Sequence, residues 1–421
     1  MSKEIDLLTM LALKPDMESK ENVEKVIAND KILDEYLNET RSPLTKPPHV
    51  VIIGGGIISL MTAFYLEKLG FQISIVEKES FGAAASGRNG GAVMMMGREL
   101  VEIPFARHSI KLWEQLSKDG IDTHFERSGH LMVARNDVEE ERLIKAYELY
   151  KASGIPVELL NNEHMKKYTP YLGKENRIGL FSYEDAQSYP FTTIQSIIKL
   201  LKEKGVNFHP YTKVTDFETK NDEITGVVTQ SGVIKGDYYL LCTGPWTTEI
   251  GKQLNEIIAV RPRRSQLMVT EVSKKGSVVP FFTGNGFYSR QTHIGNILFG
   301  GGGPHEIDGF EVKNTSYAIQ LLSKRFTEVF PAYRTKQLIR GFAGTVEITP
   351  DLIPAFGKML NWDNGFVSAG FHGHGYGLSA VMGKLMSCML YEYATDQSPS
   401  KNIQSALSPF GIQRFKQLTK V

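Results

Sequence analysis

The fold is decided by residues 50–77, which read VVIIGGGIISLMTAFYLEKLGFQISIVE. The β-branched run at 50–53 is typical of a buried strand, and it leads at once into a turn of three glycines at 54–56. Apolar residues at helical spacing follow up to Leu69, Gly70 marks the helix end, and a second apolar run covers 73–76. A strand, turn, helix and second strand within roughly 30 residues predict a parallel βαβ unit.

The glycine turn has the pattern of a dinucleotide-binding site. Gly54 permits the tight turn, Gly56 lets the backbone approach a pyrophosphate, and Ser59 stands where a third glycine is usual. The next helix presents unpaired N–H groups and a partial positive charge to that anion. Glu77 ends the second strand, where its carboxylate can accept bonds from ribose hydroxyls, and Lys78 follows it as a further candidate. By itself this pattern does not choose between NAD and FAD.

Two further stretches of small residues favour FAD. The loop at 81–91 reads FGAAASGRNGG, and its lack of side-chain bulk suits a second close approach of the backbone to the cofactor. The stretch at 370–377 reads GFHGHGYG and opens a long helix from Leu378. The N-terminus of that helix can stabilise the negative charge that gathers on the pyrimidine edge of a reduced flavin.

Bulk properties exclude several classes of protein. The 421 residues are 41% hydrophobic and 23% charged, which predicts two to three globular units. A net charge of +1 gives no argument for nucleic-acid binding, and there is no metal-ligand spacing. Cys242 and Cys388 lie in apolar runs and are predicted to be buried free thiols. The N-terminus lacks the pattern of a signal peptide, and the apolar window at 50–64 is shorter than the roughly 20 residues that span a bilayer, so we expect a cytoplasmic protein.

Residues 1–48 are predicted to be a helical extension and linker. Val23, Val26, Leu33 and Leu37 lie near helical spacing, a shorter helix is expected around Leu7, and prolines break the chain at 43, 47 and 48. The extension can pack on its own domain or on a protein partner, and the sequence does not choose.

The motifs together resemble the D-amino-acid oxidase superfamily of FAD enzymes. Within it, the chain is most similar to the group of sarcosine oxidase beta subunits, D-amino-acid dehydrogenases and proline dehydrogenases. The stretches that carry the resemblance are 54–77, 85–91 (ASGRNGG), 349–357 (Thr-Pro-Asp with Pro354 and Gly357), 370–376 and, more weakly, 242–246 (CTGPW). They span nearly everything except the extension. They are specific for fold and cofactor and do not identify the substrate.

This resemblance implies an α/β plus α+β fold. A discontinuous Rossmann-like FAD domain would comprise 49–95, 185–255 and 340–421. A substrate domain of 96–184 and 256–339 would place a large, mostly antiparallel sheet over the flavin. The residues implied to hold FAD, besides Gly54, Gly56, Ser59, Glu77 and Lys78, are Ser86, Arg88, Asn89, Gly90, Gly91, Val214, Thr243, Gly244, Trp246, Gly373, His374, Gly375, Tyr376 and Gly377.

Departures from the family pattern carry information too. Several relatives tether the flavin through a cysteine near the Thr-Pro-Asp motif, but residues 342–345 contain none, so we expect non-covalent FAD. Monomeric sarcosine oxidases place a lysine on the strand that resembles 296–299, where it helps the flavin to meet oxygen. No lysine stands there, which favours a dehydrogenase over a fast oxidase. The electron acceptor, oxygen or an electron-transfer partner, stays open.

The predicted reaction is oxidation of the C–N bond of a small amine or amino acid, such as a sarcosine-like or proline-like secondary amino acid or a D-amino acid. Arg290 is a candidate to clamp a substrate carboxylate, Tyr288 to wall the pocket, His374 to stand in the active site and Glu347 to bind an ammonium group. For Arg290 a surface position is the alternative. His372 and the pair Arg263-Arg264 are expected to be solvated.

Two other classes of function stay open at this stage. One is an NAD-dependent Rossmann dehydrogenase, which the loop at 81–91 and the glycines at 370–377 disfavour. The other is a flavin-bearing subunit of a larger dehydrogenase, with residues 1–48 as an interaction module for the partner that it would need for turnover.

Overall fold

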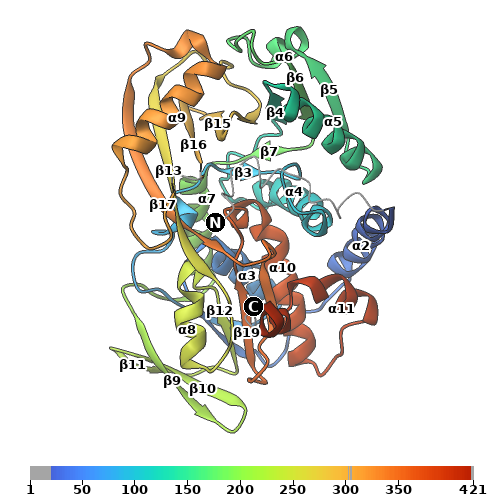
Figure 1. The fold of residues 1–421 in the computed structure, drawn as a ribbon. Helices are drawn as coiled ribbons and strands as arrows, with labels where there is room; N and C mark the ends of the chain where they lie inside the picture. The colour runs from blue at the N-terminus through green and yellow to red at the C-terminus, as the bar shows by residue number, and fades with distance from the viewer. Residues whose placement is uncertain (1–19, 302, 304–305, 419–421) are drawn as a thin grey trace.

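The computed structural model describes residues 20–301, 303 and 306–418 (Figure 1). The short helix expected around Leu7 lies outside these residues. Two sheets form the body of the molecule, and the predicted βαβ unit begins the first of them.

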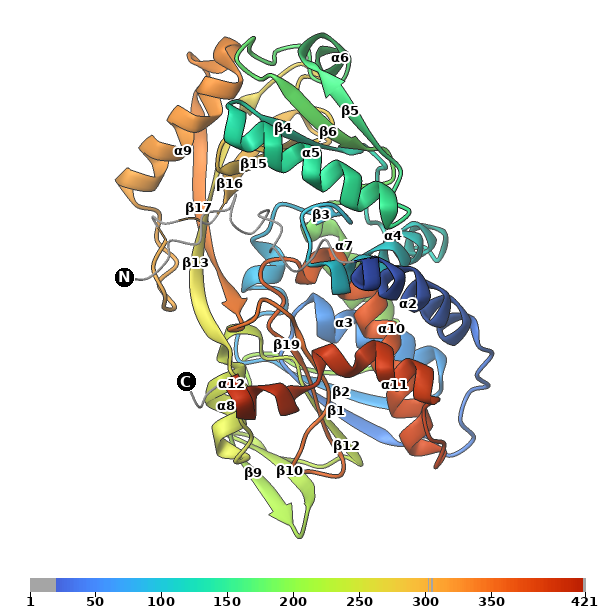
Figure 2. The same cartoon turned by 45° about the vertical axis from the view of Figure 1, so that its right-hand side comes forward.

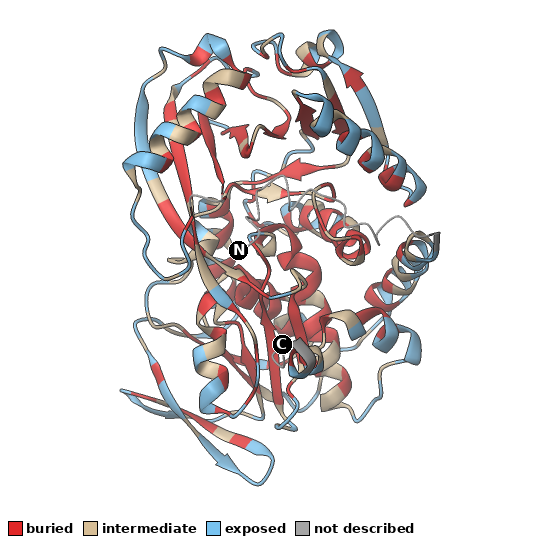
Figure 3. Ribbon diagram, in the orientation of Figure 1, coloured by how far each residue is buried: buried red, intermediate tan, exposed pale blue. Residues whose placement is uncertain are grey.

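The first sheet has six strands in the order β18-β19-β12-β1-β2-β8. All neighbours in it are parallel except the pair β18 and β19. Its strands are β1 His49–Ile53, β2 Gln72–Val76, β8 Asn207–His209, β12 Tyr238–Leu241, β18 Ala355–Lys358 and β19 Gly365–Ala369. Its central strands are buried (Figure 3), as expected for parallel strands covered on both faces.

The two faces of this sheet support two separate cores. Val50 and Ile52 of β1 belong to the core that includes α3 Ile57–Lys68 and α10 Gly375–Ala394, and these two helices pack against each other (Figures 1 and 2). Val51 and Ile53 point the other way, into a core shared with a small antiparallel sheet. That sheet consists of β9 Val214–Lys220, β10 Glu223–Thr229 and β11 Gly232–Ile234. The period-two alternation of β1 therefore decides which layer each residue meets.

The second sheet has eight strands in the order β17-β13-β16-β15-β14-β4-β6-β5, and only the pair β4 and β14 is parallel. Helices α5 Asp137–Ala152, α6 Asn162–Tyr168 and α9 Ser316–Val329 accompany it in the upper half of Figure 1. Its strands are β4 His130–Ala134, β5 Val157–Asn161, β6 Ile178–Ser182, β13 Arg261–Val272, β14 Phe281–Gly284, β15 Phe287–Gln291, β16 Asn296–Gly301 and β17 Leu338–Ile348. The predicted fold class is confirmed.

The predicted domain boundaries stay a prediction, and one element, β17, lies across one of them. Strand β17, at 338–348, belongs to the eight-stranded sheet, although residues from 340 on were assigned to the FAD domain. Helix α4 Ile103–Lys118, assigned to the substrate domain, packs against α10. Helix α7 Pro190–Glu203 packs against α3, and β3 Ala92–Val93 pairs with β7 Ala186–Gln187. These contacts join the segments 49–95 and 185–255, which were both assigned to the FAD domain.

The described part of the N-terminal extension packs on its own chain. Helix α2 Lys20–Asn38 lies against α4 and α11 Lys401–Leu407, and it buries Val26, Leu33 and Leu37. Asp30 forms an ion pair of 2.8 Å with Arg107 of α4. For residues 20–38 the intramolecular alternative is therefore the observed one, while a protein partner through 1–48 stays a prediction.

Two further predictions concern thiols and membranes. Cys242 and Cys388 are buried and free, as predicted. Within the ranges that the structure describes, no helix is both long and apolar enough to cross a membrane. The expected cytoplasmic location stays a prediction.

Candidate functional site

A cavity of about 260 Å³ lies between the two sheets. Its lining comes from the start of α3, from the loop that follows β2, from the roof strands β13, β14, β15 and β17, and from the glycine stretch before α10. Of the predicted site residues, those in the lining are Ser86, Arg88, Asn89, Gly90, Gly91, Tyr288, Glu347, Gly373, His374, Gly375 and Tyr376. The sequence thus identified much of one wall.

The glycine turn at the end of β1 packs closely against the backbone at Cys242. Gly54 has a φ of +106°, and a Cβ there would lie 2.2 Å from the carbonyl oxygen of Cys242. Gly56 precedes α3, which has no side-chain cap and no acidic residue in its first turn. The Ile57 N–H donates to Ser86 Oγ at 2.9 Å. This helix start, with its uncompensated partial positive charge, fits a pyrophosphate. Ser59 is fully buried within the helix.

Glu77 is held beside the glycine turn. Its carboxylate accepts hydrogen bonds from the N–H groups of Gly55 at 2.6 Å and Glu79 at 2.8 Å. Each oxygen keeps a second lone pair, so the acid can still accept from ribose hydroxyls. Next to it, the ammonium of Lys78 lies 3.3 Å from the ring centre of Trp246, and burial lowers the pKa of Lys78. Glu77, Lys78 and Trp246 were all predicted to hold the cofactor. The structure places Lys78 against Trp246, and none of the three lines the cavity.

Three other predicted cofactor residues also lie outside the cavity lining. Val214 is buried in the same core as Val76, the last residue of β2. Thr243 bonds Thr247 through their hydroxyls at 2.9 Å, and Gly244 has a φ of +54°. Their roles toward a cofactor stay predictions.

The loop at 85–91 is folded tightly against the roof. The Asn89 side chain donates to the carbonyl of Ser86 at 2.5 Å and accepts from the N–H of Gly91 at 2.7 Å. Arg88 donates to the carbonyl of Ala343 on β17 at 3.2 Å. A Cβ on Gly90 would lie 2.7 Å from the Tyr288 ring, so the roof tyrosine packs directly on this loop.

Arg290 follows Tyr288 by two residues on β15 and is 4% exposed. Its guanidinium carbon lies 3.0 Å from where a Cβ on Gly91 would stand, and it is not part of the cavity lining. Its Nε is buried with no hydrogen-bond partner, and burial lowers the pKa of the guanidinium. The alternative of a surface arginine is wrong. Among the residues that the structure describes, no acidic side chain forms an ion pair with Arg290. A buried cation without a paired anion is costly, so a ligand that carries an anion would stabilise it.

The glycine stretch at 370–377 leads into α10 and carries the polar side chains of His372, His374 and Tyr376. Tyr376 is buried, and its hydroxyl lies 2.5 Å from Ser188 Oγ; burial raises the pKa of Tyr376 to about 12. His374 lines the cavity and faces Glu102. The carbonyl of Gly377 accepts bonds from Ser109 and Trp113 of α4, which fixes the start of α10.

Glu347 of β17 is a buried carboxyl group at the cavity wall. Its Oε1 accepts from the Phe371 N–H at 3.2 Å, and its Oε2 is buried without a hydrogen-bond partner. Burial raises the pKa of Glu347. Of the predicted catalytic residues, the structure therefore brings Tyr288, Glu347 and His374 to the cavity and leaves Arg290 just behind its lining.

The prediction that His372 is solvated was wrong. This residue is 5% exposed, its Nε2 lies 2.8 Å from Thr349 Oγ1, and its Nδ1 is buried without a hydrogen-bond partner. Burial lowers its pKa to about 3. His372 lies between β19 and α10, where the chain passes next to Glu347 and Thr349 at the end of β17, and short-range sequence patterns do not reveal this contact.

We expect His372 to make the fold sensitive to acid. Because its folded-state pKa is lowered from 6.5 to about 3, the fold favours the neutral imidazole, and stability is complete above pH 6.5 and lost as the pH falls below it. The loss is about 1.4 kcal/mol per pH unit, or about 2 kcal/mol at pH 5. Asparagine tolerates the φ of +53° at this position and does not titrate.

The measurement is urea unfolding of the wild type and His372→Asn at pH 7.5 and pH 5.0. The drop in unfolding free energy between the two pH values should be about 2 kcal/mol smaller in the variant. An equal drop in both proteins would show that other groups cause the acid sensitivity.

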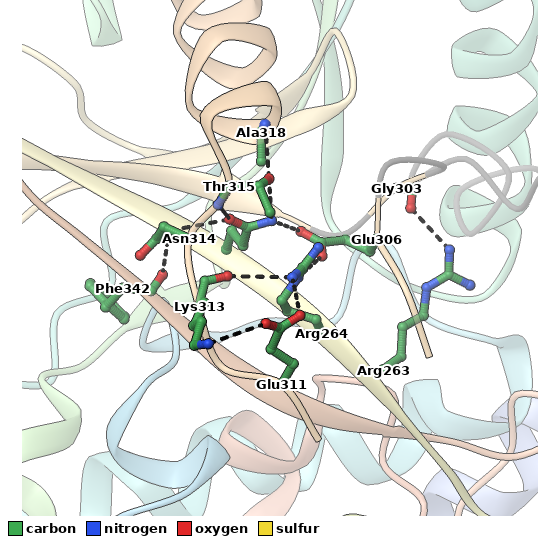
Figure 4. Close-up of polar contacts among 11 residues, drawn as sticks. Arg263, Arg264, Gly303, Glu306, Glu311, Lys313, Asn314, Thr315, Ala318 and Phe342 are labelled. Atoms are coloured by element: carbon green, nitrogen blue, oxygen red, sulfur yellow. Dashed lines mark hydrogen bonds and ion pairs between the residues drawn. The ribbon is translucent and has the colours of Figure 1, made fainter. Parts of the chain in front are cut away.

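The expectation of a solvated Arg263-Arg264 pair was also wrong. Arg264 is 3% exposed and donates through Nε to Glu306 at 2.8 Å, within a cluster that includes Glu311 and Lys313 (Figure 4). Arg263 stands apart in this view, donates to the carbonyl of Gly303 at 2.9 Å and lines the cavity. Successive side chains of β13 point to opposite faces of the sheet, so the two adjacent arginines have different surroundings.

A second group of buried polar residues near the cavity was not predicted from the sequence. His130 lies 2.8 Å from Thr283 Oγ1 and 3.4 Å from the carboxylate of Asp185. Arg98 donates to the carbonyl of Met94 at 2.5 Å, and Glu102 faces His374 at 3.4 Å. These residues come together only in the folded chain, and no motif marks them.

A family model described as "DAO: FAD dependent oxidoreductase" matches residues 49–389. The chain belongs to this family. The resemblance inferred from the sequence, the enzyme class and the cofactor are thereby confirmed. The site agrees with them: the turn at Gly54, the free start of α3 and the small-residue loop at 85–91 fit FAD.

Relatives in this DAO family differ in length and assembly. The chain is 25% identical to the mitochondrial pyruvate dehydrogenase phosphatase regulatory subunit of Mus musculus, over 87% of this chain but only 43% of that protein. It is 24% identical to sarcosine oxidase subunit beta of Rhizobium meliloti, covering 89% of this chain and 90% of that protein. The solved L-proline dehydrogenase from P. horikoshii superposes with a TM-score of 0.80 at 26% identity, over 89% and 99% of the two chains.

Proposed function

We propose that the protein oxidises the C–N bond of a small amine or amino acid, with a secondary amino acid or a D-amino acid as substrate. The observation that carries the proposal is the cavity, whose lining includes the loop at 85–91, the stretch at 373–376, Tyr288 and Arg263, with Arg290 buried just behind the lining. Relatives named for sarcosine and proline support this substrate class.

The residues of this chain would bind FAD and orient the substrate. Gly54, Gly56 and Glu77 would hold the ADP half, and the 85–91 loop with the 373–376 stretch would hold the flavin, without a covalent link. When bound, FAD supplies the acceptor, at N5, for the hydride that leaves the substrate carbon. The product imine hydrolyses in water without help from the protein.

The substrate's two functional groups would meet different side chains. A carboxylate would pair with a guanidinium, and Arg290 is the first candidate because no acidic side chain of the described residues forms an ion pair with it. Arg263 is the alternative, since it lines the cavity. The amine would meet His374, whose Nε2 has no partner within the described part of the chain. Tyr288 and the roof sheet would keep water away.

A flavin-bearing subunit of a larger dehydrogenase is the second candidate. The Rhizobium relative is by name a subunit, and the chain matches 90% of it. In that case the isolated chain would bind FAD but turn over slowly until its partner is added. The alternative of an NAD-dependent dehydrogenase has lost its support, because the matching family is FAD dependent.

The test is the absorbance spectrum of the purified protein, followed by anaerobic addition of sarcosine, L-proline, D-proline, D-alanine, glycine and an opine. Loss of the flavin band on addition of one compound would support the proposal and identify the substrate. Reoxidation by air would then distinguish an oxidase from a dehydrogenase. A stable flavin band with every compound would favour the subunit. Protein that neither contains nor binds FAD would overturn the proposal.

A further inference from the structure

Glu102 is a fully buried carboxylate next to the cavity wall. It stands at the N-cap position of α4, yet its side chain makes no capping bond to that helix. One oxygen, Oε2, lies 3.4 Å from His374 Nδ1, and the other, Oε1, is buried without a hydrogen-bond partner among the described residues. Burying a carboxylate with so few bonds is costly, and helix capping does not explain it.

The surroundings of Glu102 keep it ionised. Burial alone would raise its pKa, but its interactions with His374 and Arg98 outweigh burial, so its pKa is lowered. An ionised carboxylate is only an acceptor, so the nitrogen that faces it must carry a proton. That nitrogen is Nδ1 of His374.

His374 stands at the wall of the cavity in which a substrate amine would bind, and its Nδ1 lies toward Glu102. His374 lines the cavity, and 26% of its side chain stays exposed. A neutral imidazole carries one N–H, so a proton on Nδ1 leaves a lone pair on Nε2. A carboxylate behind the ring also fixes the orientation of the ring.

We propose that Glu102 is a positioning residue that holds His374 in the Nδ1–H form, so that Nε2 accepts the proton of the substrate ammonium group. The step converts the ammonium to a neutral amine, and the proton passes to His374, where the imidazolium is paired with the Glu102 carboxylate. Only the neutral amine has the nitrogen lone pair that assists departure of hydride from the neighbouring carbon. The inference rests on the proposed amine substrate.

The first test needs no turnover. Nitrogen NMR of the FAD-loaded protein labelled at histidine, with the His374 signals assigned by their loss in His374→Gln, reports which ring nitrogen carries the proton. We expect Nδ1–H in the wild type and a shift toward Nε2–H in Glu102→Gln. The Nε2–H form in the wild type would overturn the proposal, whether or not the variant folds.

The second test is anaerobic reduction of the bound flavin by the substrate found with the amine panel. Glu102→Gln should lower the rate constant by about 10- to 100-fold and change the substrate Kd by less than about threefold. The matched control is Glu256→Gln, because Glu256 is also buried, also has an oxygen without a hydrogen-bond partner and lies outside the cavity lining.

The control variant should reduce at the wild-type rate. An unchanged rate in Glu102→Gln, or an equal loss in both variants, would overturn the positioning role. If no amine reduces the wild type, the proposed function fails, whereas the NMR result still decides whether Glu102 sets the protonated nitrogen.

Discussion

Gly54→Ala is expected to yield protein without FAD and with a large loss of stability. The alanine Cβ would lie 2.2 Å from the Cys242 carbonyl oxygen, a backbone atom of β12's end that cannot move without disturbing the sheet. The φ of +106° adds conformational strain for any residue with a Cβ. If the turn opens instead, the start of α3 shifts and the pyrophosphate loses its N–H donors.

The measurement is the ratio of flavin to protein absorbance together with the unfolding temperature. Gly205→Ala is the matched control, since Gly205 also has a positive φ, of +84°, but a Cβ there has open space. We expect the control to retain FAD at wild-type stoichiometry and to lose only about 1 kcal/mol of stability from backbone strain. Full FAD content in Gly54→Ala would show that the turn does not hold the cofactor.

The first βαβ unit and the cofactor motifs could be predicted because their signals are local. The strand at 49–53, the turn at 54–56 and the helix from Ile57 follow one another within a single stretch of sequence. Apolar periodicity and glycine conformation are properties of neighbouring residues, and here both predict the same βαβ unit.

The rest of the site depends on contacts between residues far apart in the chain. Arg264 pairs with Glu306, 42 positions away, and His374 with Glu102, 272 positions away. No spacing rule connects such pairs, so the sequence predicted solvated side chains at 264 and 372 and overlooked Glu102. Register between distant strands, such as Arg264 opposite Thr345, decides which charges become buried.

The burial of Arg290 also depends on contacts between distant parts of the chain. Replacing its side chain is expected to have the largest effect on substrate binding. Arg290→Met should raise the KM of the amino-acid substrate about 100-fold, which corresponds to about 2.7 kcal/mol and is in the range of hydrogen bonds to a charged group. The corresponding amine without a carboxylate should bind with its KM changed less than about threefold. Methionine keeps the unbranched shape of the side chain, so loss of charge is the main change.

Arg263→Met is the comparison variant, because Arg263 lines the cavity but donates to the Gly303 carbonyl. A loss of carboxylate binding in Arg263→Met alone would show that Arg263, and not Arg290, binds the substrate carboxylate.

The unfolding temperature is a second measurement that distinguishes a residue that binds the substrate from one that stabilises the fold. Arg290 is buried, and no acidic side chain of the described ranges forms an ion pair with it, so Arg290→Met should raise the unfolding temperature of the substrate-free protein. Weaker carboxylate binding together with higher stability would show that the fold tolerates an unpaired buried charge because the substrate provides its partner.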